Sequence, residues 1–399
     1  MRAALLPALG LLLAALLACS APAAAPNSGP AARQATPTAE EEEESEGPKP
    51  GSAPTATARP LPTTVASGLK TELIVEGLQL PQSMAFAADG RLFFVEVKRG
   101  DVRVLDGKVL QEQPVLTVRV PRGGEQGLIG LALDPGFDRN HYLYTFYTQA
   151  QKGVDVGRAR MHRLTRWTEH GGSAGSETSV LGDLPFGKCC HTGGKLAFAP
   201  DGSLFLALGD QGDLDRQQAQ NPSRLNGKLL HLDVERVMRE HPDPLTLVYA
   251  GGLRNPYGLD IHPITGAPFL MDNGPDRCDE LNLMREGANY GSPVVACAPH
   301  DPRFEDPIWE SGPDRLGVTG LAIYRGSMFP EYANHPLFCS VNTGNLMHAV
   351  LEAPGYDKVE RVDQVVSGQD GEGCRLGPAI APDGSIYYAS MTKIFRVYR

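Results

Sequence analysis

The segment LAFAPDGSLFLALGD, residues 196–210, contains two short apolar stretches separated by Pro200, Asp201 and Gly202. Both stretches are short and apolar, and an Asp-Gly pair between two such stretches is a strong hairpin signal. The sequence therefore predicts a β-hairpin at this position. Its pattern of strand, turn and second strand recurs along the chain from residue 66 onward.

Five other segments repeat this pattern: MAFAADGRLFFVE (84–96), LALDPGFDRNHYLYTFYT (131–148), LDIHPITGAPFLMDN (259–273), LAIYRGSMFPEYANHPLFCS (321–340) and AIAPDGSIYYAS (379–390). Successive copies begin about 50 to 65 residues apart, which leaves room for two more strands in each repeat. The expected fold is all-β: a six-bladed β-propeller of four-stranded antiparallel blades. We expect the strand around Glu72–Val75 to pair with the final segment KIFRVYR and close the ring.

Equivalent positions in the six blades of a propeller lie around one axis, so residues at the same point of each repeat come together. Polar residues stand just before each first strand: Gln82, Glu125, Gln126, His191, Arg254, Asn255, Thr319 and Arg375. The second strands return to the same end and bring Glu96, Asp210, Asn273 and Asn342. The sequence thus predicts a polar site at one mouth of the central channel.

His191 and Asp210 are the candidate catalytic pair of this site. If Asp201-Gly202 forms a two-residue turn, Asp210 lies opposite Gly193, two positions from His191, and the two side chains can touch. An aspartate that accepts a hydrogen bond from one imidazole nitrogen fixes the tautomer, and the other nitrogen can then take a proton from a substrate. We therefore predict that His191 is a general base.

Four motifs resemble those of the glucose/sorbosone dehydrogenase family, over most of the chain from about residue 72 to 293. They are EQGLIGLALDPGFDRNHYLY (125–144), CCHTGGKLAFAPDGSLFLALGDQGD (189–213), GGLRNPYGL (251–259) and DNGPDRCDELNLMREGANYGSP (272–293). This resemblance implies a six-bladed propeller that holds pyrroloquinoline quinone (PQQ) and Ca²⁺ over the central channel, with a sugar above the quinone.

The resemblance also implies roles for individual residues. His191 matches the base and Asp210 its partner, while Arg254 and Asn255 match residues that cradle PQQ. The backbone carbonyls of Gly274 and Pro275 match ligands of Ca²⁺, and Asp279, Glu280 and Tyr290 fall where some members bind a second Ca²⁺. Glu125, Gln126, Arg325 and Arg375 complete the expected cofactor-binding set.

The implied reaction is oxidation of an aldose at C1 to the lactone. His191 would take the proton of the anomeric hydroxyl while the C1 hydrogen leaves as hydride to the quinone, and Arg254 would stabilise the developing oxyanion. The reduced cofactor would then pass electrons to a separate acceptor, a cytochrome or a quinone. The expected small-molecule substrate is a sugar.

The chain departs from the family pattern where the carboxylates of PQQ should be held. Glu125 stands where many members have glutamine, Arg325 replaces a lysine, and Cys374-Arg375-Leu376 replaces an Arg-x-Arg motif. Cys190 replaces an acidic residue that some members have before the histidine. A cofactor with three carboxylates thereby loses bidentate partners.

Two alternatives remain open on these residues. One is a non-catalytic propeller that binds a glycan or a protein, which would need neither His191 nor Asp210. The other is a calcium-dependent propeller lactonase, which would need carboxylate and amide side chains directly on Ca²⁺ at the axis. The acidic loop around Asp279 has no EF-hand spacing, so a solvated loop also explains it.

The N-terminus predicts export. Arg2 precedes an apolar run that ends in Leu16-Leu17-Ala18-Cys19, which resembles a lipobox cut before a lipidated cysteine; an ordinary cleaved signal is the alternative. The domains are then a signal peptide (1–18), lipidated Cys19 with a Pro/Ala/Glu-rich tether (19–65) and the propeller (66–399). We expect a cell-envelope protein whose membrane contact is the lipid on Cys19.

The cysteines and the net charge narrow the possible partners. Six cysteines follow Cys19, and their spacing suggests Cys278–Cys297, Cys339–Cys374 and a vicinal Cys189–Cys190 pair, although sequence alone allows other connectivities. A zinc site at Cys189, Cys190 and His191 is disfavoured, because adjacent cysteines lack the usual spacer. The net charge of −10 argues against nucleic acid as a partner. We expect a monomer or a dimer.

Overall fold

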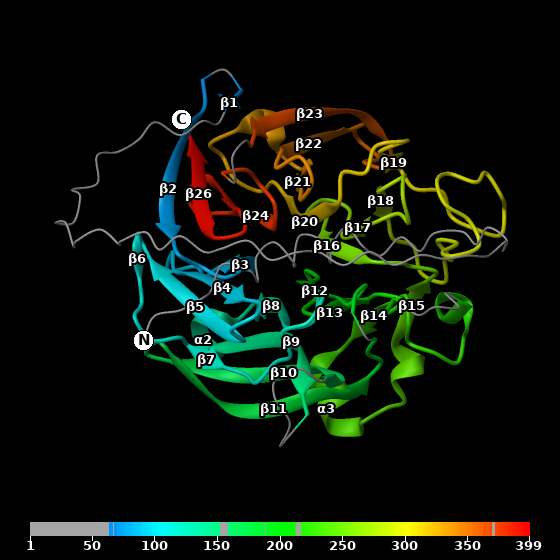
Figure 1. Ribbon diagram of the computed structural model, residues 1–399, viewed down its shortest axis with the longest axis horizontal. Coiled ribbons are helices and arrows are strands. Elements are labelled where there is room, and N and C mark those ends of the chain that lie inside the picture. Colours follow the sequence, from blue (N-terminus) through cyan, green and yellow to red (C-terminus); the bar gives the residue numbers. More distant parts are fainter. Residues whose placement is uncertain (1–63, 67, 152–158, 188, 213–216, 369–371) are drawn as a thin grey trace, which may run out of the picture.

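The computed structural model describes residues 64–66, 68–151, 159–187, 189–212, 217–368 and 372–399. Their strands form six antiparallel sheets arranged around a central channel (Figure 1). The predicted six-bladed β-propeller is therefore confirmed. The predicted signal peptide, Cys19 and almost all of the tether lie outside the described residues, and the short strand β1 (Thr64–Val65) pairs with β23 of the fifth blade.

The strands of each blade run in order from the channel to the outer rim. From the innermost strand outward, the first blade is β3 (Pro81–Phe86), β4 (Leu92–Glu96) and β5 (Asp101–Asp106), with β6 (Val109–Leu110) and β7 (Leu116–Thr117) both paired to β5, and the second blade is β8 (Leu128–Leu133), β9 (Tyr142–Ala150), β10 (Ala159–His170) and β11 (Ser173–Leu184). The third blade is β12 (Gly193–Phe198), β13 (Leu204–Leu208), β14 (Lys228–Leu232) and β15 (Val248–Gly251). The fourth blade is β16 (Pro256–Ile261), β17 (Pro268–Asp272), β18 (Glu280–Leu283) and β19 (Trp309–Glu310). The fifth is β20 (Val318–Ile323), β21 (Pro336–Ser340), β22 (Leu346–Leu351), β23 (Val359–Ser367), and the sixth is β24 (Gly377–Ile380), β25 (Ile386–Ala389), β26 (Lys393–Tyr398), β2 (Lys70–Glu76).

The sixth blade joins the two ends of the described chain. Strand β2 pairs with β26, with Glu72 opposite Arg396 and Leu73 opposite Phe395, as the sequence predicted. The innermost strands contact their neighbours all around the ring, including β24 with β3. Ring closure therefore gives every innermost strand of the described chain a neighbouring blade on both sides.

The Asp-Gly hairpins have longer loops than predicted. In the third blade Ala199 N–H donates to the Ser203 carbonyl, so the loop contains Pro200, Asp201 and Gly202 rather than two residues. Gly202 closes it at φ +86°, the left-handed conformation of a three-residue loop with a G1 bulge. The predicted register was wrong, because Gly193 lies opposite Leu208 rather than Asp210.

The blades pack through apolar side chains, and the described chain contains three disulfides, two between loop residues and one that joins Cys339 in β21 to a loop. Phe93, Phe146, Phe269, Phe338 and Phe395 are fully buried, one in each of five blades. The disulfides are Cys189–Cys190, Cys278–Cys297 and Cys339–Cys374, which confirms the predicted pairing. These covalent links are expected of a protein that folds in an oxidising compartment.

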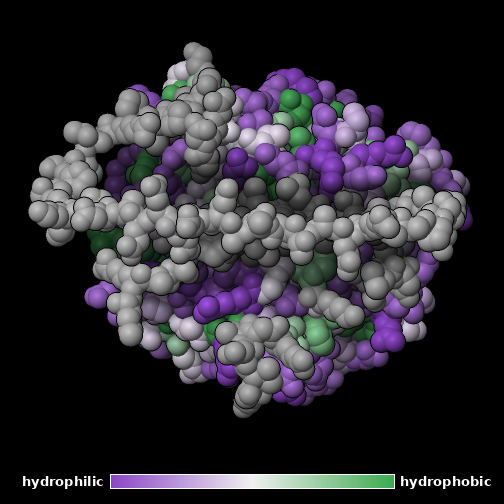
Figure 2. All heavy atoms as spheres, viewed as in Figure 1, coloured by the Kyte–Doolittle hydropathy of each residue, from purple (hydrophilic) through white to green (hydrophobic). Residues whose placement is uncertain are grey.

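Helices contribute little to the described chain. They are α2 (Phe137–Asn140), α3 (Val234–Glu240) and three short 3₁₀ turns, η1 (Gln217–Gln220), η2 (Pro244–Leu247) and η3 (Pro330–Tyr332). Within the described residues, none of the helices has the length and apolar character needed to cross a membrane. The face in Figure 2 is mostly hydrophilic where it is coloured, and exposed large apolar residues such as Phe186 and Ile264 occur singly.

Candidate active site

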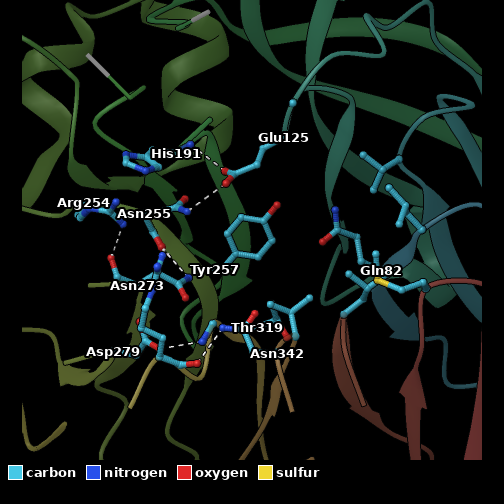
Figure 3. Close-up of a pocket in the computed structure, with 18 of the residues that line it drawn as sticks. Gln82, Glu125, His191, Arg254, Asn255, Tyr257, Asn273, Asp279, Thr319 and Asn342 are labelled. Atoms are coloured by element: carbon cyan, nitrogen blue, oxygen red, sulfur yellow. Dashed lines mark hydrogen bonds between the residues drawn. The ribbon is translucent and has the colours of Figure 1, made fainter. Parts of the chain in front are cut away.

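A polar pocket opens at the end of the channel where the innermost strands begin (Figure 3). All six blades contribute to its lining, because each contributes the residues at or before the start of its innermost strand. The polar lining side chains are Gln82, Lys98, Glu125, His191, Arg254, Asn255, Tyr257, Asn273, Asp279, Arg315, Thr319 and Asn342. Of the residues that the sequence predicted for this mouth, Gln82, Glu125, His191, Arg254, Asn255, Asn273, Thr319 and Asn342 are among them.

His191, which lines the pocket, forms a buried hydrogen-bonded pair with Asp210, which is not part of the lining. His191 Nδ1 lies 2.6 Å from Asp210 Oδ1, and both residues are almost completely buried. The irregular pairing between Gly193 and Lys195 brings the two residues level, since Gln211 N–H donates to the His191 carbonyl. Asp210 Oδ1 also accepts from Gly212 N–H at 2.8 Å, which fixes the carboxylate.

Glu125 holds the backbone of His191 from the neighbouring blade. Its Oε2 accepts from His191 N–H at 2.8 Å and from Thr192 N–H at 3.4 Å, and Oε1 lies 3.4 Å from Asn255 Nδ2. His191 has φ +55°, a left-handed conformation that is uncommon for a residue with a side chain. The Glu125 carboxylate therefore helps to keep the imidazole at the pocket wall.

Arg254 and Asn255 are held by Asp272 through their backbones. The two N–H groups donate to the two oxygens of the buried Asp272 carboxylate, at 2.8 and 2.6 Å, and Arg254 Nη1 donates to the Asn273 carbonyl at 2.8 Å. Burial raises the pKa of Asp272 to about 6, although these hydrogen bonds act in the opposite direction. Arg254 Nε and Asn255 Oδ1 are buried without a partner among the described residues, so both remain available to a ligand.

Asp279 braces the loop that carries Gly274 and Pro275. Its carboxylate accepts from Gly274 N–H at 3.0 Å and from Gly317 N–H at 2.7 Å, and burial raises its pKa. Gly274 lines the pocket and Pro275 follows it in the same partly buried loop. The backbone at Gly274 is thus fixed at the pocket wall, where its carbonyl oxygen is of the type that Ca²⁺ prefers.

Glu280 and Tyr290 lie outside the pocket lining. Glu280 lies opposite Asp272 and Glu310 on the neighbouring strands, and burial together with these carboxylates raises its pKa to about 8. Tyr290 Oη donates to the Leu283 carbonyl at 2.7 Å and accepts from Arg285 N–H at 3.0 Å. Backbone groups therefore already use the Tyr290 hydroxyl.

Arg325 does not belong to this site. It follows β20, whereas the pocket lies where β20 begins, and its guanidinium makes a bidentate ion pair with Asp260 at 2.9 Å near the opposite channel opening. Gln126 Nε2 donates to the Gly187 carbonyl at 2.6 Å, and Arg375 Nη1 donates to the Val341 carbonyl. Neither of these two side chains is part of the pocket lining, although both lie in loops next to it.

Sequence reasoning missed Tyr257, Lys98 and Arg315, which also line the pocket. Tyr257 is the first residue after Pro256 in β16, within the predicted GGLRNPYGL motif, so its place in the repeat could have identified it. Lys98 and Arg315 lie in loops whose lengths differ between blades. Lys98 Nζ donates to the carbonyls of Gly124 and Gln126, and burial lowers its pKa to about 8.

The fold and the pocket define a class of protein, the six-bladed β-propellers with a polar site at one mouth of the central channel. Within that class, the chain belongs to the glucose/sorbosone dehydrogenase family, whose model matches residues 78–396. This family membership confirms the resemblance seen in the sequence. It also assigns the chain an oxidoreductase role.

Relatives of known identity span a range of functions. The aldose sugar dehydrogenase YliI of Escherichia coli is 26% identical over 80% of this chain and 89% of its own length. Quinoprotein glucose dehydrogenase B of Acinetobacter calcoaceticus is 29% identical over 56% of this chain and 52% of its own length. Mouse hedgehog-interacting protein is 30% identical over 48% of this chain and 31% of its own length.

Solved structures share the fold closely. An oxidoreductase (glucose dehydrogenase) of Thermus thermophilus has a TM-score of 0.71 and 30% identity, over 83% of this chain and all of that chain. The PQQ-bound aldose sugar dehydrogenase of Streptomyces coelicolor has a TM-score of 0.69 and 22% identity, over 84% of this chain and 99% of that chain. At this lower identity the second likeness shows the fold alone.

Proposed function

We propose that this protein is a PQQ-dependent dehydrogenase that oxidises an aldose at C1 to the lactone, with His191 as the general base. The observation that carries the proposal is that His191 lines a polar pocket at the propeller axis and is hydrogen-bonded to the buried Asp210. Both parts are needed for this chemistry, because a base must be oriented and the substrate must lie beside it.

The pocket fits a polycarboxylate quinone. Arg254, Lys98 and Arg315 line it with positive charge, and the buried Arg254 Nε and Asn255 Oδ1 lack partners in the described chain that a bound cofactor can provide. We propose that Arg254 and Asn255 hold PQQ, and that the Gly274 and Pro275 carbonyls hold Ca²⁺. Asp279 and Glu280 are candidate ligands of a second Ca²⁺. When bound, PQQ supplies the acceptor for two electrons and the C1 hydrogen.

The residues of the chain supply the proton transfer and the orientation. Asp210 accepts the Nδ1 proton of His191, so Nε2 is the nitrogen that receives the proton of the C1 hydroxyl. The Asp210 carboxylate then stabilises the imidazolium. The Arg254 guanidinium, held by the Asn273 carbonyl, provides positive charge where negative charge develops during the reaction.

We further propose an extracytoplasmic location and a separate electron acceptor. The three disulfides and the N-terminal export signal support this location, and anchoring through a lipid on Cys19 is part of the same proposal. A sugar is the small-molecule partner, and a cytochrome or quinone is the expected acceptor.

One observation favours a second candidate, a propeller that binds a glycan or a protein without catalysis. The place of the family's Arg-x-Arg holds Arg375 alone, and its guanidinium is used by the Val341 carbonyl rather than lining the pocket. A binding propeller would not require PQQ at this site. The two candidates therefore differ in whether PQQ is bound and reduced.

The test is to load the purified chain with PQQ and Ca²⁺ and to follow the quinone absorbance as single aldoses are added. We expect bleaching with at least one aldose, and its loss in His191→Asn. The matched control is His300→Asn, because His300 Nδ1 also lies 2.6 Å from an aspartate, Asp306, but on the exposed surface. No bleaching with any aldose, or equal bleaching in His191→Asn, would contradict the proposal.

A further inference from the structure

A buried lysine lies in the channel directly beneath the pocket. Lys195 is in the middle of β12, the innermost strand of the third blade, and only 6% of the residue is exposed. Its Nζ donates to Gln82 Oε1 at 3.0 Å and lies 3.4 Å from Ser83 Oγ, both from β3 of the first blade. It also lies 4.9 Å from the centre of the Tyr257 ring in β16. Lys195 thus joins three blades across the channel.

Two of these partners connect Lys195 to the pocket. Gln82 and Tyr257 line the pocket, while Lys195 and Ser83 line the narrower cavity below it. The faces of aromatic rings attract cations, and an amide oxygen is a good acceptor for an ammonium group. The pocket floor therefore rests on an amine whose charged form these partners favour.

Among the described residues, no carboxylate lies within the 4.0 Å ion-pair distance of this lysine. The carboxylate that acts electrostatically on it is Glu125, in the loop before β8. The six innermost strands contain only two other ionisable side chains, Tyr257 and Asp260. Asp260 pairs with Arg325 near the opposite channel opening, and burial keeps the pKa of Tyr257 well above its usual value.

Burial accordingly lowers the pKa of Lys195 to about 7, while Glu125 acts in the opposite direction. A buried cation without a direct partner is destabilised, and an anion that enters the low-dielectric space beside it favours the charged form. Lys98 also faces Glu125, but its Nζ already donates to several backbone carbonyls in the loop after Gly123. Lys195 is therefore the amine whose charged form an anionic ligand in the pocket would stabilise.

We propose that Lys195 is the positioning residue that balances the negative charge of the cofactor in the pocket, and that it takes up a proton from solvent when the cofactor binds. This inference rests on the proposed function, since it concerns the carboxylates of PQQ. Lys195 acts on the cofactor through its electric field and through its contacts with Gln82 and Tyr257, without touching the reacting atoms. It supplies part of the positive charge that the missing Arg-x-Arg motif does not.

The test is calorimetric titration of the calcium-loaded full chain with PQQ at pH 7.5, in phosphate and in Tris buffer, whose ionisation enthalpies differ. For the wild type we expect a binding enthalpy that depends on the buffer, which reports proton uptake. Lys195→Met should weaken PQQ binding by about tenfold or more and reduce the uptake. Lys195→Arg should bind PQQ nearly as tightly as the wild type but without this uptake, because arginine is always charged.

The matched control is Lys228→Met. Lys228 is also buried, with a pKa lowered by burial to about 8, but its Nζ donates to the Ala219 and Asn226 carbonyls outside the pocket. It should keep wild-type affinity and proton uptake. Folded Lys195→Met with wild-type PQQ affinity and proton uptake would overturn this inference without affecting the proposed function. Full proton uptake in Lys195→Arg would do the same. A wild type that binds no PQQ would refute the proposed function as well.

Discussion

At the residue scale, the hydrogen bond between His191 and Asp210 can be tested without changing the shape of the pair. Asparagine in place of Asp210 can donate as well as accept, so the imidazole loses its fixed tautomer and the carboxylate charge. We expect Asp210→Asn to lower kcat by about a hundredfold to ten-thousandfold with a smaller change in KM, measured by steady-state dye reduction.

The control for this prediction is Asp306→Asn, which alters the exposed pair with His300 in the same way. It should leave both constants unchanged. A kcat of Asp210→Asn within about twofold of the wild type would show that the pair has no catalytic role.

A second prediction at this scale concerns acid sensitivity. His162 is completely buried beside Gln211, and burial lowers its pKa from 6.5 to about 4. Between these pH values the unfolded chain binds a proton that the folded chain does not, so stability falls as pH falls, by about 1 kcal/mol per pH unit from this residue. Above pH 6.5 the effect is absent.

Denaturant unfolding at several pH values checks this expectation. His162→Gln, which can still bond to Gln211, should show a smaller loss of stability between pH 6.5 and 4.5 than the wild type. Exposed His170→Gln should keep the wild-type slope. Identical slopes in all three proteins would contradict the assignment.

At the element scale, the three-residue loop of the third blade depends on the left-handed Gly202. A Cβ there would meet no atom within 4 Å, so any effect of a substitution comes from the backbone alone. We expect Gly202→Ala to lower the free energy of unfolding by about 1–2 kcal/mol. Gly175→Ala, also in open space but without a positive φ, should not destabilise, and equal effects in denaturant unfolding would refute the backbone argument.

The same element explains which parts of the molecule the sequence could predict. The alternation of strands and turns repeats in every blade, so the number of blades and the start of each innermost strand were visible. Register was not visible, because Asp201-Gly202 belongs to a three-residue loop and the pairing shifts again between Gly193 and Lys195. These shifts bring Asp210 level with His191.

The site residues also divide into those whose position the repeat predicts and those whose position it does not. His191, Arg254 and Asn255 precede their strands directly, so the repeat places them at the mouth of the channel. Arg325 follows its strand and lies near the opposite opening, so the resemblance to a family motif predicted its position wrongly. Lys195 could not be recognised as a buried cation, because its partners Gln82 and Tyr257 come from two other blades.

At the scale of the whole molecule, the pairing of β2 with β26 should control cooperative unfolding. Removal of residues 1–66 takes away β1 but retains β2 and β26, whereas removal of residues 1–76 also takes away β2 and exposes the edge of β26. We expect the shorter truncation to keep a single calorimetric transition and the longer one to broaden it and lower Tm by several degrees. Equal Tm values for both truncations would show that ring closure contributes little to stability.

The sixth blade also makes the pocket a late product of synthesis. Leu376 and Met391, from the last part of the chain, stand in the pocket wall beside Leu80 and Gln82 from the first blade. A chain without the sixth blade would lack this side of the cavity. If the proposed cofactor binds here, its capture requires the closed ring, because this pocket wall forms only where the first and the sixth blades meet.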